Sequence, residues 1–326
     1  MAEQSASTAR NILFRGYGLW KFPNFFSSVR IDAPSLGLGT ASRLHFRRLT
    51  IGSSARQLPD GQTREGERLP VYFMTGREHW HMTAFCAFSL LRQTRANIIP
   101  TILDDGTLGS LETAQLRRIL PQSEFLNREE CDSQVNVTLP FARYPSLHLL
   151  RSKLPLMRKL MDLHAGRTGW RLFLDSDMLF HHEPKWMLEW LTSPQHPTYM
   201  WDFQNSYGYS ESSIAAALGH PMPPMVNTGF YGLQSDAVDW DRLESWSRQL
   251  YAAEGVNHFT EQCLIAMAMA ENGSRPAPRE YLIWPDENET LKPTAVMHHY
   301  VAESRTWYLV HGFPELLKKA RAENRS

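Results

Sequence analysis

The stretch Trp170–Pro184, with the sequence WRLFLDSDMLFHHEP, most constrains what this chain can fold into. Arg171–Leu174 is an apolar run of strand length that ends in Asp175-Ser176-Asp177, and a second short apolar run follows. Side chains two residues apart in an extended chain leave on the same face, so both carboxylates would point to one side. The stretch therefore predicts a buried strand that delivers two carboxylates to an edge of a sheet. Such a pair also occurs in turns and at helix starts, but after a buried strand it suits Mg²⁺ or Mn²⁺.

An alternation of strands and helices runs through the middle of the chain. It predicts right-handed crossovers and an α/β fold with a mainly parallel central sheet flanked by helices. The expected strands, besides the one before the Asp pair, are Val71–Met74, Ile98–Leu103, Glu124–Leu126, Thr198–Phe203, Met225–Leu233 and Val296–Val301. The expected helices are Trp80–Leu91, Leu108–Leu120, Pro184–Leu191, Trp240–Tyr251 and Phe259–Ala270.

Polar residues gather where the predicted strands end. Thr75 and Gly76 follow the first strand, Asp104 and Asp105 follow the second, and the Asp pair follows the central one. In an open parallel sheet the ligand crevice lies at the carboxyl ends of the strands. These positions predict one site of nucleotide size, in which Thr75, Gly76 and either Asp104 or Asp105 hold a nucleoside.

The segment that leads into the central strand is helical and basic, and it ends near Gly166. Arg151, Lys153, Arg158 and Lys159 lie on it, and Pro155 either begins the helix or kinks it. A basic residue on its inner side could reach a diphosphate. A charged run on a helix is also typical of a solvated face, so both interpretations stay open.

The remaining segments are harder to interpret. In the N-terminal extension, residues 1–68, the aromatic-rich stretch Asn11–Val29 is expected to form an irregular cover or a hairpin, and Ser53–Arg68 an exposed linker. Ser206–Pro224 is expected to be a loop that could act as a mobile lid. We place one catalytic domain at 69–313 and a basic C-terminal helix or tail at 314–326.

Composition limits the functional classes and suggests the compartment. Lys plus Arg equals Asp plus Glu, at 34 each, so no global field favours nucleic acid. Three widely spaced cysteines form no disulfide or zinc pattern and suggest reduced thiols. The chain begins with no signal-like sequence and contains no run long enough for a transmembrane segment. We therefore expect a cytoplasmic protein.

Two adjacent histidines downstream supply further metal-ligating chemistry. His298 and His299 lie on a predicted strand, so their side chains point to opposite faces and at most one enters the site. An imidazole added to two carboxylates shifts the preference from Mg²⁺ toward Mn²⁺.

Taken together, these motifs resemble retaining glycosyltransferases of the GT-A fold, a Rossmann-like architecture, and in particular glycosyltransferase family 8, the glycogenin-like group. The resemblance covers about residues 69–313. The segments that carry it are Asp175-Ser176-Asp177, Asn227-Thr-Gly229, Glu261-Gln262-Cys263, His299-Tyr-Val-Ala-Glu-Ser-Arg305-Thr-Trp307, and the helical pair Arg151 and Pro155. The spacing from His299 to Trp307 equals the family's spacing, which selects His299 over His298 as metal ligand.

The resemblance implies a function and a role for each matching residue. It implies metal-dependent transfer of a hexose-type sugar from a nucleoside diphosphate sugar, expected to be a UDP-sugar, to an acceptor hydroxyl with retention. Asp175, Asp177 and His299 would hold Mn²⁺ or Mg²⁺. The donor would be bound by Arg151 or its rival Lys153, together with Ser176, Gly229 and Arg305, and the catalytic positions would be Asn227, Glu261 and Gln262. No nucleophile is assigned, and Glu261 is equally expected as a carboxylate favoured at a helix N-terminus.

The chain also departs from the family pattern. Cys263 stands where the family has a second Asp, Ala302 replaces a glycine, and Arg305-Thr306 replaces Lys-Pro. Arg305 could still contact a diphosphate, because guanidinium binds phosphate oxygens well. Two alternative functions remain. One is a sugar-phosphate nucleotidyltransferase, which usually has a glycine-rich loop with Arg and Lys after the first strand; Met74–Glu78 matches such a loop only in part. The other is a non-catalytic sugar-nucleotide-binding protein.

Overall fold

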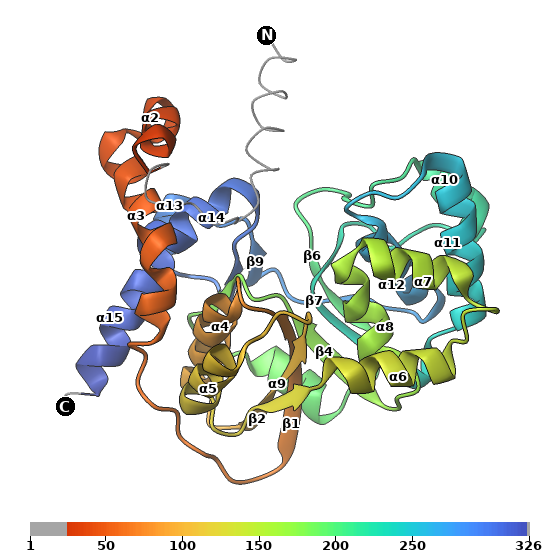
Figure 1. The fold of residues 1–326 in the computed structure, drawn as a ribbon, viewed down its shortest axis with the longest axis horizontal. Helices are drawn as coiled ribbons and strands as arrows, with labels where there is room; N and C mark the ends of the chain where they lie inside the picture. Colours follow the sequence, from red (N-terminus) through yellow and green to blue (C-terminus); the bar gives the residue numbers. More distant parts are fainter. Residues whose placement is uncertain (1–24, 325–326) are drawn as a thin grey trace.

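The structure, a computed structural model, describes residues 25–324 and contains a central seven-stranded sheet (Figure 1). The strand order is β3-β2-β1-β4-β7-β6-β8, and every strand except β7 runs in the same direction. The predicted α/β fold with a mainly parallel sheet between helices is confirmed. The strands are β1 Arg68–Thr75, β2 Asn97–Asp104, β3 Glu124–Leu126, β4 Trp170–Leu174, β6 Thr198–Trp201, β7 Val226–Gln234 and β8 Arg275–Pro276.

Two hydrophobic cores lie on opposite faces of this sheet. Val71 and Phe73 of β1 enter one core while Tyr72 enters the other, because side chains alternate along a strand. The first core is covered by α3 Leu38–Ala55, α4 Trp80–Arg92, α5 Ser110–Ile119, α9 Lys185–Thr192 and α15 Phe313–Glu323. The second is covered by α6 Arg128–Thr138, α7 Pro145–Lys153, α8 Arg158–His164, α10 Glu211–Leu218, α11 Trp240–Glu254 and α12 Thr260–Glu271.

A small three-stranded sheet continues from the central strand. Its strands are β5 Met178–Phe180, β10 Met297–His299 and β9 Tyr281–Ile283, in the order β5-β10-β9. β10 runs antiparallel to β5 and parallel to β9. Because β5 follows β4 after only three residues, this sheet brings the C-terminal part of the chain to the carboxyl end of the central strand.

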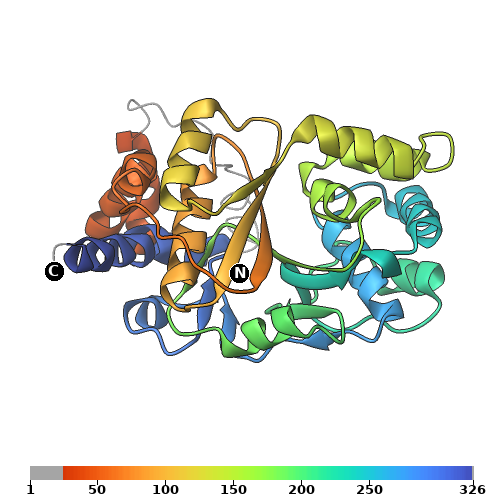
Figure 2. The same cartoon turned by 90° about the horizontal axis from the view of Figure 1, so that it is seen from below.

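The two ends of the described chain pack against each other beside α4. Helix α3 lies next to α15 in both ribbon views (Figures 1 and 2), and α2 Phe25–Leu36 packs on α3. Leu44 and Ile51 of α3 share the first core with Phe313 and Leu317 of α15. Both helices therefore belong to the core of the predicted catalytic domain and form no core of their own.

The expected exposed linker Ser53–Arg68 is wrong in its first and middle parts. Ser53–Ala55 completes α3, and the guanidinium of Arg64 donates to the carbonyl oxygens of Leu91, Thr94 and Ala96. An arginine that satisfies the carbonyl groups at the end of α4 fixes this segment to the domain. A run rich in polar residues and glycine carries no sign of such a bond.

Other boundaries differ from expectation for local reasons. The Ser206–Pro224 segment contains α10, which begins at the Ser210 cap and ends at Gly219 in the left-handed conformation (φ 82°). The basic helix is divided at Leu154 and Pro155 into α7 and α8, since proline cannot continue a helix. The predicted cover Asn11–Val29 lies mostly outside the described residues, and α2 begins at Phe25. The remaining short helices are α13 Glu287–Leu291 and α14 Arg305–Trp307.

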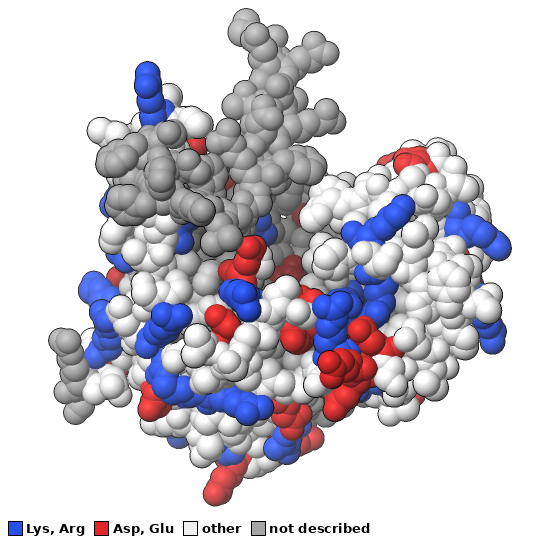
Figure 3. Space-filling view, in the orientation of Figure 1, with Lys and Arg blue, Asp and Glu red and all other residues white. Residues whose placement is uncertain are grey.

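Charges of both signs are mixed on the face of the molecule drawn in Figure 3. Lys and Arg side chains alternate with Asp and Glu on the face drawn in Figure 3, with no field of one sign across it. None of the helices between residues 25 and 324 combines the length and hydropathy that crossing a bilayer requires. Cys86, Cys131 and Cys263 are all buried free thiols.

Candidate active site at the carboxyl end of the central strand

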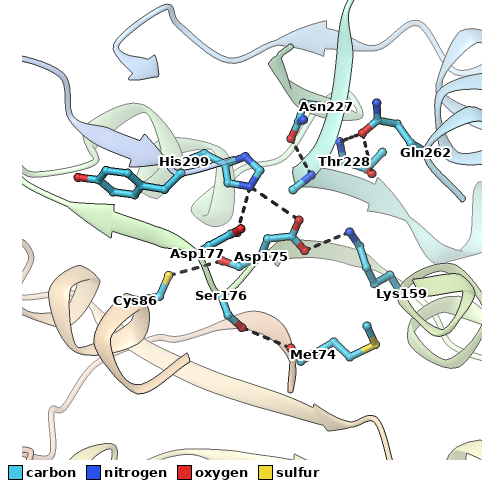
Figure 4. Close-up of polar contacts among 12 residues, drawn as sticks. Met74, Cys86, Lys159, Asp175, Ser176, Asp177, Asn227, Thr228, Gln262 and His299 are labelled. Atoms are coloured by element: carbon cyan, nitrogen blue, oxygen red, sulfur yellow. Dashed lines mark hydrogen bonds and ion pairs between the residues drawn. The ribbon is translucent and has the colours of Figure 1, made fainter. Parts of the chain in front are cut away.

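The residues predicted as metal ligands meet at the junction of the two sheets. Asp175 follows β4, Asp177 precedes β5, and His299 is the last residue of β10. The pairing of β10 with β5 sets His299 opposite Met178, and the N–H of Tyr300 donates to the carbonyl oxygen of Asp177 (2.9 Å). Ligand atoms of Asp175, Asp177 and His299 all lie within 4.8 Å of one another (Figure 4).

His298 and His299 lie on opposite faces of β10, as strand geometry requires. His299 Nε2 is 3.1 Å from Asp177 Oδ1 and 3.9 Å from Asp175 Oδ2. His298 is fully buried on the other side, where its ring nitrogens bond Glu289 Oε1 (2.9 Å) and Tyr300 Oη (3.0 Å). His299 therefore faces the Asp pair, whereas His298 belongs to a separate hydrogen-bonded cluster.

Two cations hold the outer oxygens of the Asp pair. Lys159 Nζ lies 3.1 Å from Asp175 Oδ1, and Arg305 donates to Asp177 Oδ2 from Nε (3.0 Å) and Nη2 (2.7 Å). Burial opposes ionisation of Asp177, but Arg305 and His299 outweigh it and hold the pKa of that carboxyl well below its usual range. Burial also opposes the charge on Lys159, but Asp175 and Glu261 outweigh it and raise the pKa of the amine.

This group of side chains fits a divalent metal. Two ionised carboxylates and one imidazole are a donor set that Mn²⁺ and Mg²⁺ accept. His299 Nδ1 is buried without a hydrogen-bond partner among the described residues. Asp175 Oδ2 likewise accepts no hydrogen bond from the described part of the chain, its nearest ionic partner being His299 Nε2 at 3.9 Å. A cation between the two carboxylates and His299 Nε2 would complete the pairing of Asp175 Oδ2.

Gly229 leaves room for the imidazole of His299. A Cβ added to Gly229 would collide with His299 Cε1 and Nδ1. Its backbone also supports the site, because the N–H of Asp175 donates to Gly229 O (2.6 Å). A larger residue here would displace His299 from the Asp pair. A glycine inside a strand often marks a close approach of this kind.

The antiparallel direction of β7 explains how Asn227 reaches the same edge of the sheet. Asn227 is the second residue of β7, so it lies beside the carboxyl ends of the parallel strands. Its Nδ2 donates to Asp202 Oδ2 (3.2 Å), which also accepts from Gln262 Nε2 (3.3 Å). Gln262 further bonds Ser206 O and the N–H of Thr228. Asn227 and Gln262 thus form one polar layer around Asp202, beside Asp175, Asp177 and His299.

Glu261, in the first turn of α12, is a buried carboxylate with incomplete pairing. It is 2% exposed, its Oε1 lies 3.7 Å from Lys159 Nζ, and its Oε2 accepts from Thr228 Oγ1 (3.4 Å). Burial raises the pKa of Glu261 to about 7, and Asp175 adds to the increase while Lys159 opposes it. A carboxyl group of this kind exchanges a proton near neutral pH.

The residues predicted for the nucleoside lie at the ends of β1 and β2. The N–H of Asp105 donates to Thr75 O (2.9 Å), and Thr75 Oγ1 is buried without a hydrogen-bond partner in the described residues. Asp104 Oδ1 accepts from the N–H groups of Gly106 and Leu108, and Asp105 Oδ1 accepts from Thr107. One oxygen of each aspartate is thus committed to its own turn. A Cβ at Gly76 would collide with the Asp105 carboxylate.

Three predicted donor contacts have other partners. Ser176 Oγ bonds Thr83 Oγ1 of α4 (2.7 Å), on the side away from Asp175 and Asp177. Arg151 bonds Asp132 and Asp162, and Lys153 Nζ lies 5.4 Å from the ring centroid of Tyr251. Of the four basic residues on this segment, Lys159 is the one bonded to the Asp pair.

Sequence reasoning missed several residues of the site. Lys159 was one of four equivalent basic residues, and its position became clear only when Pro155 divided the helix. Asp202 was placed inside a predicted strand, but β6 ends at Trp201. Asp202 therefore lies at the carboxyl end of a strand, where ligand sites of open α/β sheets occur. His79 and His258 complete the surroundings. Burial, together with charges that include Arg305, lowers the pKa of both imidazoles.

Backbone strain surrounds the same group of residues. The three described residues other than glycine with positive φ are Met225 (52°), Trp284 (58°) and Ala302 (46°). Met225 lies two residues before Asn227, the N–H of Trp284 donates to His299 O (3.0 Å), and Ala302 lies three residues after His299. Non-glycine residues in this conformation cost free energy and often cluster at functional sites.

Comparisons with known proteins give only distant likenesses. No protein-family model matches the chain, and no curated protein matches its sequence. The galactosyltransferase LgtC, solved with donor and acceptor sugar analogues, aligns at a TM-score of 0.48 and 11% identity over 78% of this chain and 95% of that one. Mouse xyloside xylosyltransferase 1 aligns at 0.48 and 12% over 72% and 98%, and the Streptococcus pneumoniae TIGR4 glycosyltransferase GlyE at 0.44 and 12% over 81% and 64%. At these scores and identities we draw neither fold family nor function from them.

Proposed function

We propose that this protein is a metal-dependent glycosyltransferase of GT-A type, which moves a hexose-type sugar from a nucleoside diphosphate sugar to an acceptor hydroxyl. The observation that carries the proposal is the meeting of Asp175, Asp177 and His299, with Lys159 and Arg305 beside them, at the carboxyl ends of a mainly parallel sheet. Two carboxylates, an imidazole and two cations suit a site that binds a metal together with a diphosphate.

The donor would lie along this edge of the sheet. Thr75, with Asp104 or Asp105, would hold the nucleoside, which we expect to be uridine, and a carboxylate oxygen would accept from a ribose hydroxyl. Asp175, Asp177 and His299 would hold Mn²⁺ or Mg²⁺, which neutralises the charge that develops on the leaving diphosphate. Arg305, 41% exposed at its side chain, would turn one face of its guanidinium to the phosphate oxygens.

The sugar and the acceptor would lie beside Asn227, Gly229, Glu261 and Gln262. Asn227 and Gln262 present amides whose orientation is fixed by Asp202. Lys159 keeps a positive charge between Asp175 and Glu261, which orients both carboxylates. With a pKa near 7, Glu261 can accept a hydrogen bond from a hydroxyl or donate one to it. We infer retention at the anomeric carbon from the resemblance in the sequence motifs, and we assign no nucleophile.

Calorimetric titration with UDP, with and without Mn²⁺, tests the proposal directly. We expect binding that requires the metal and that weakens at least about 100-fold in Asp177→Ala, because the variant loses a buried carboxylate ligand. Lys185→Glu, an exposed charge change on α9, is the matched control and should bind UDP as the native chain does. A screen of UDP-sugars for metal-dependent release of UDP follows. Binding that ignores both the metal and the Asp177 variant would refute the proposed site.

A further inference from the structure

A cavity lies on the other side of the small sheet from the Asp pair. It has a volume of about 950 Å³, within the range of small-molecule sites. Its walls are the end of α4, the end of β5, the residues around α13 and the C-terminal helix α15. Leu179, which lines it, pairs with His298, the histidine that faces away from the metal-ligand group. None of the predicted site residues lines this cavity.

The cavity has an excess of positive charge. Five cationic side chains line it, against the single carboxylate of Glu315; the cations are Arg47, Arg92, Lys318, Lys319 and Arg321. Arg92 pairs with Glu323, and Lys318 lies 3.5 Å from Glu315. Among the described residues, no carboxylate pairs with Arg47, Lys319 or Arg321, and Arg321 bonds only the neutral amide of Gln57. Three cationic side chains without a carboxylate partner among the described residues therefore line one cavity, although the formal net charge of the chain is zero.

An unpartnered buried nitrogen lies in the same cavity. His181 Nε2 is buried and has no hydrogen-bond partner in the described part of the chain. The ring packs on that of His298, with centroids 4.3 Å apart, and His298 is itself fixed by Glu289 and Tyr300. Burial lowers the pKa of His181 to about 3, so the ring is neutral at physiological pH and can still donate one N–H. In the tautomer that carries its proton at Nε2, this buried nitrogen is satisfied by a hydrogen-bond acceptor.

The backbone beside this cavity is also unusual. Tyr308–Gly312 forms a π-helical turn between α14 and α15, and Val310, His311 and Gly312 line the cavity. Such turns appear frequently at functional sites. A Cβ at Gly312 would lie 3.0 Å from Leu179 Cδ1 and 3.3 Å from Tyr300 Oη, so this wall is closely packed against β5 and β10. This wall of the cavity is therefore held in place by its packing against the small sheet.

We propose that this cavity, lined by His181, Arg47, Lys319 and Arg321, binds a multiply charged phosphate-bearing anion at a site separate from the Asp pair. Lys319 and Arg321 of α15 and Arg47 of α3 supply the charge, and His181, which also lines the cavity, supplies a donor from Nε2. Phosphate oxygens accept charge-assisted hydrogen bonds from lysine and arginine more strongly than from neutral donors. The source of the phosphate is either a soluble polyphosphorylated compound or a lipid headgroup.

Calorimetry of the full-length chain with inorganic tripolyphosphate, at low ionic strength and without divalent metal, tests the site. We expect saturable binding that weakens at least about tenfold in Lys319→Glu/Arg321→Glu, because two attractive charges become repulsive. His181→Phe should weaken binding several-fold while keeping the ring packing on His298. Arg248→Glu is the matched control, an exposed charge change on α11, which covers the opposite face of the central sheet. Asp177→Ala should retain the native affinity, which separates this site from the one in the proposed function.

Vesicle sedimentation distinguishes the two sources of phosphate. Phosphatidylcholine vesicles with and without phosphatidic acid are compared for the native chain and for Lys319→Glu/Arg321→Glu. Binding only to phosphatidic acid vesicles, lost in the variant and competed by tripolyphosphate, would support the site and assign it to a lipid headgroup. Tripolyphosphate binding without vesicle binding would support a soluble ligand. Equal affinity of the native chain and the double variant, loss of binding in Asp177→Ala, or no binding of either probe would overturn the proposal.

Discussion

Two regions of this molecule combine aspartates with cations, and they differ in how completely the charges are paired. In the first, Asp162 is fully buried on α8 and accepts from Arg151 at Oδ1 (2.6 Å) and Oδ2 (2.8 Å), and from Arg158 at Oδ2 (2.6 Å). Asp132 of α6 bonds the same two arginines. In the second, the Asp pair is held from outside by Lys159 and Arg305 but faces partly unpaired atoms within the site.

The difference separates a structural cluster from a candidate binding site. The cluster of Asp132, Arg151, Arg158 and Asp162 satisfies itself, so it joins α6, α7 and α8 and has no need of a ligand. At the Asp pair, His299 Nδ1 and Glu261 Oε1 are buried without hydrogen bonds among the described residues. Incomplete pairing in a buried polar group costs free energy unless a ligand completes it.

The largest expected effect comes from breaking the self-satisfied cluster. Asp162→Ala should lower the free energy of unfolding by about 3 kcal/mol, because it leaves two largely buried guanidinium groups with one partly exposed aspartate. Asp177→Asn should lower it by less, about 1.5 kcal/mol, since the Arg305 side chain is 41% exposed and becomes hydrated once the carboxylate is gone. Urea denaturation of both variants measures this difference. A loss for Asp177→Asn as large as that for Asp162→Ala would remove the distinction between the two regions.

An effect of similar size concerns the pH dependence of stability at the site. The folded-state pKa of Glu261, about 7, lies above its ordinary value of 4.5, so the folded chain binds the proton more tightly than the unfolded chain. The contribution of Glu261 to stability is therefore present below about pH 4.5 and is lost as pH rises to about 7. Over this window we expect native stability to fall by about 3 kcal/mol relative to Glu261→Gln, which does not titrate.

Denaturation of both chains at several pH values between 4.5 and 8 measures this change. The difference between the two chains is the relevant quantity, because burial also lowers the pKa values of His81, His164 and His181 and these groups titrate in both. Parallel pH profiles of stability for the native chain and Glu261→Gln would contradict a raised pKa of Glu261 in the folded chain.

The smallest effect tests whether the site stores backbone strain. Ala302 has φ +46°, and glycine adopts this conformation at lower cost. We expect Ala302→Gly to raise the free energy of unfolding by up to about 1 kcal/mol, after the greater chain entropy of glycine is included. Thermal denaturation measures it, and Ala237→Gly, in a short 3-10 turn without positive φ, is the control that should be destabilised. Destabilisation by Ala302→Gly as well would show that its φ carries no net strain.

Much of the fold could be predicted from the sequence because its signals are local. The runs Val71–Met74 and Glu124–Leu126 lie in β1 and β3, since short apolar segments bounded by turns have few other ways to be buried. The helices α3 and α6 escaped prediction because neither carries a strong apolar period: α3 mixes glycine, serine and arginine with its apolar residues, and α6 is polar except for a few positions. Their helical form depends on packing against α4 and α8.

The meeting of Asp175, Asp177 and His299 could be anticipated, but its surroundings could not. The Asp pair and His299 have fixed positions relative to strand ends, so strand periodicity and motif spacing were enough to group them. The choice among Arg151, Lys153, Arg158 and Lys159 depended on where proline broke the helix and on which side each fragment presented to the sheet. The direction of β7, which brings Asn227 to the edge, has no signal in a run of buried residues.

The sequence by itself determined the alternation of strands and helices, the carboxylate pair at the end of the central strand and the presence of an imidazole that can join it. These are properties of residue type and of spacing along a strand. Only the tertiary structure decided which charges pair with one another, because pairing depends on distances between segments far apart in the chain. Arg151 and Lys159 are indistinguishable as positive charges on one segment, yet one completes a buried cluster and the other holds Asp175.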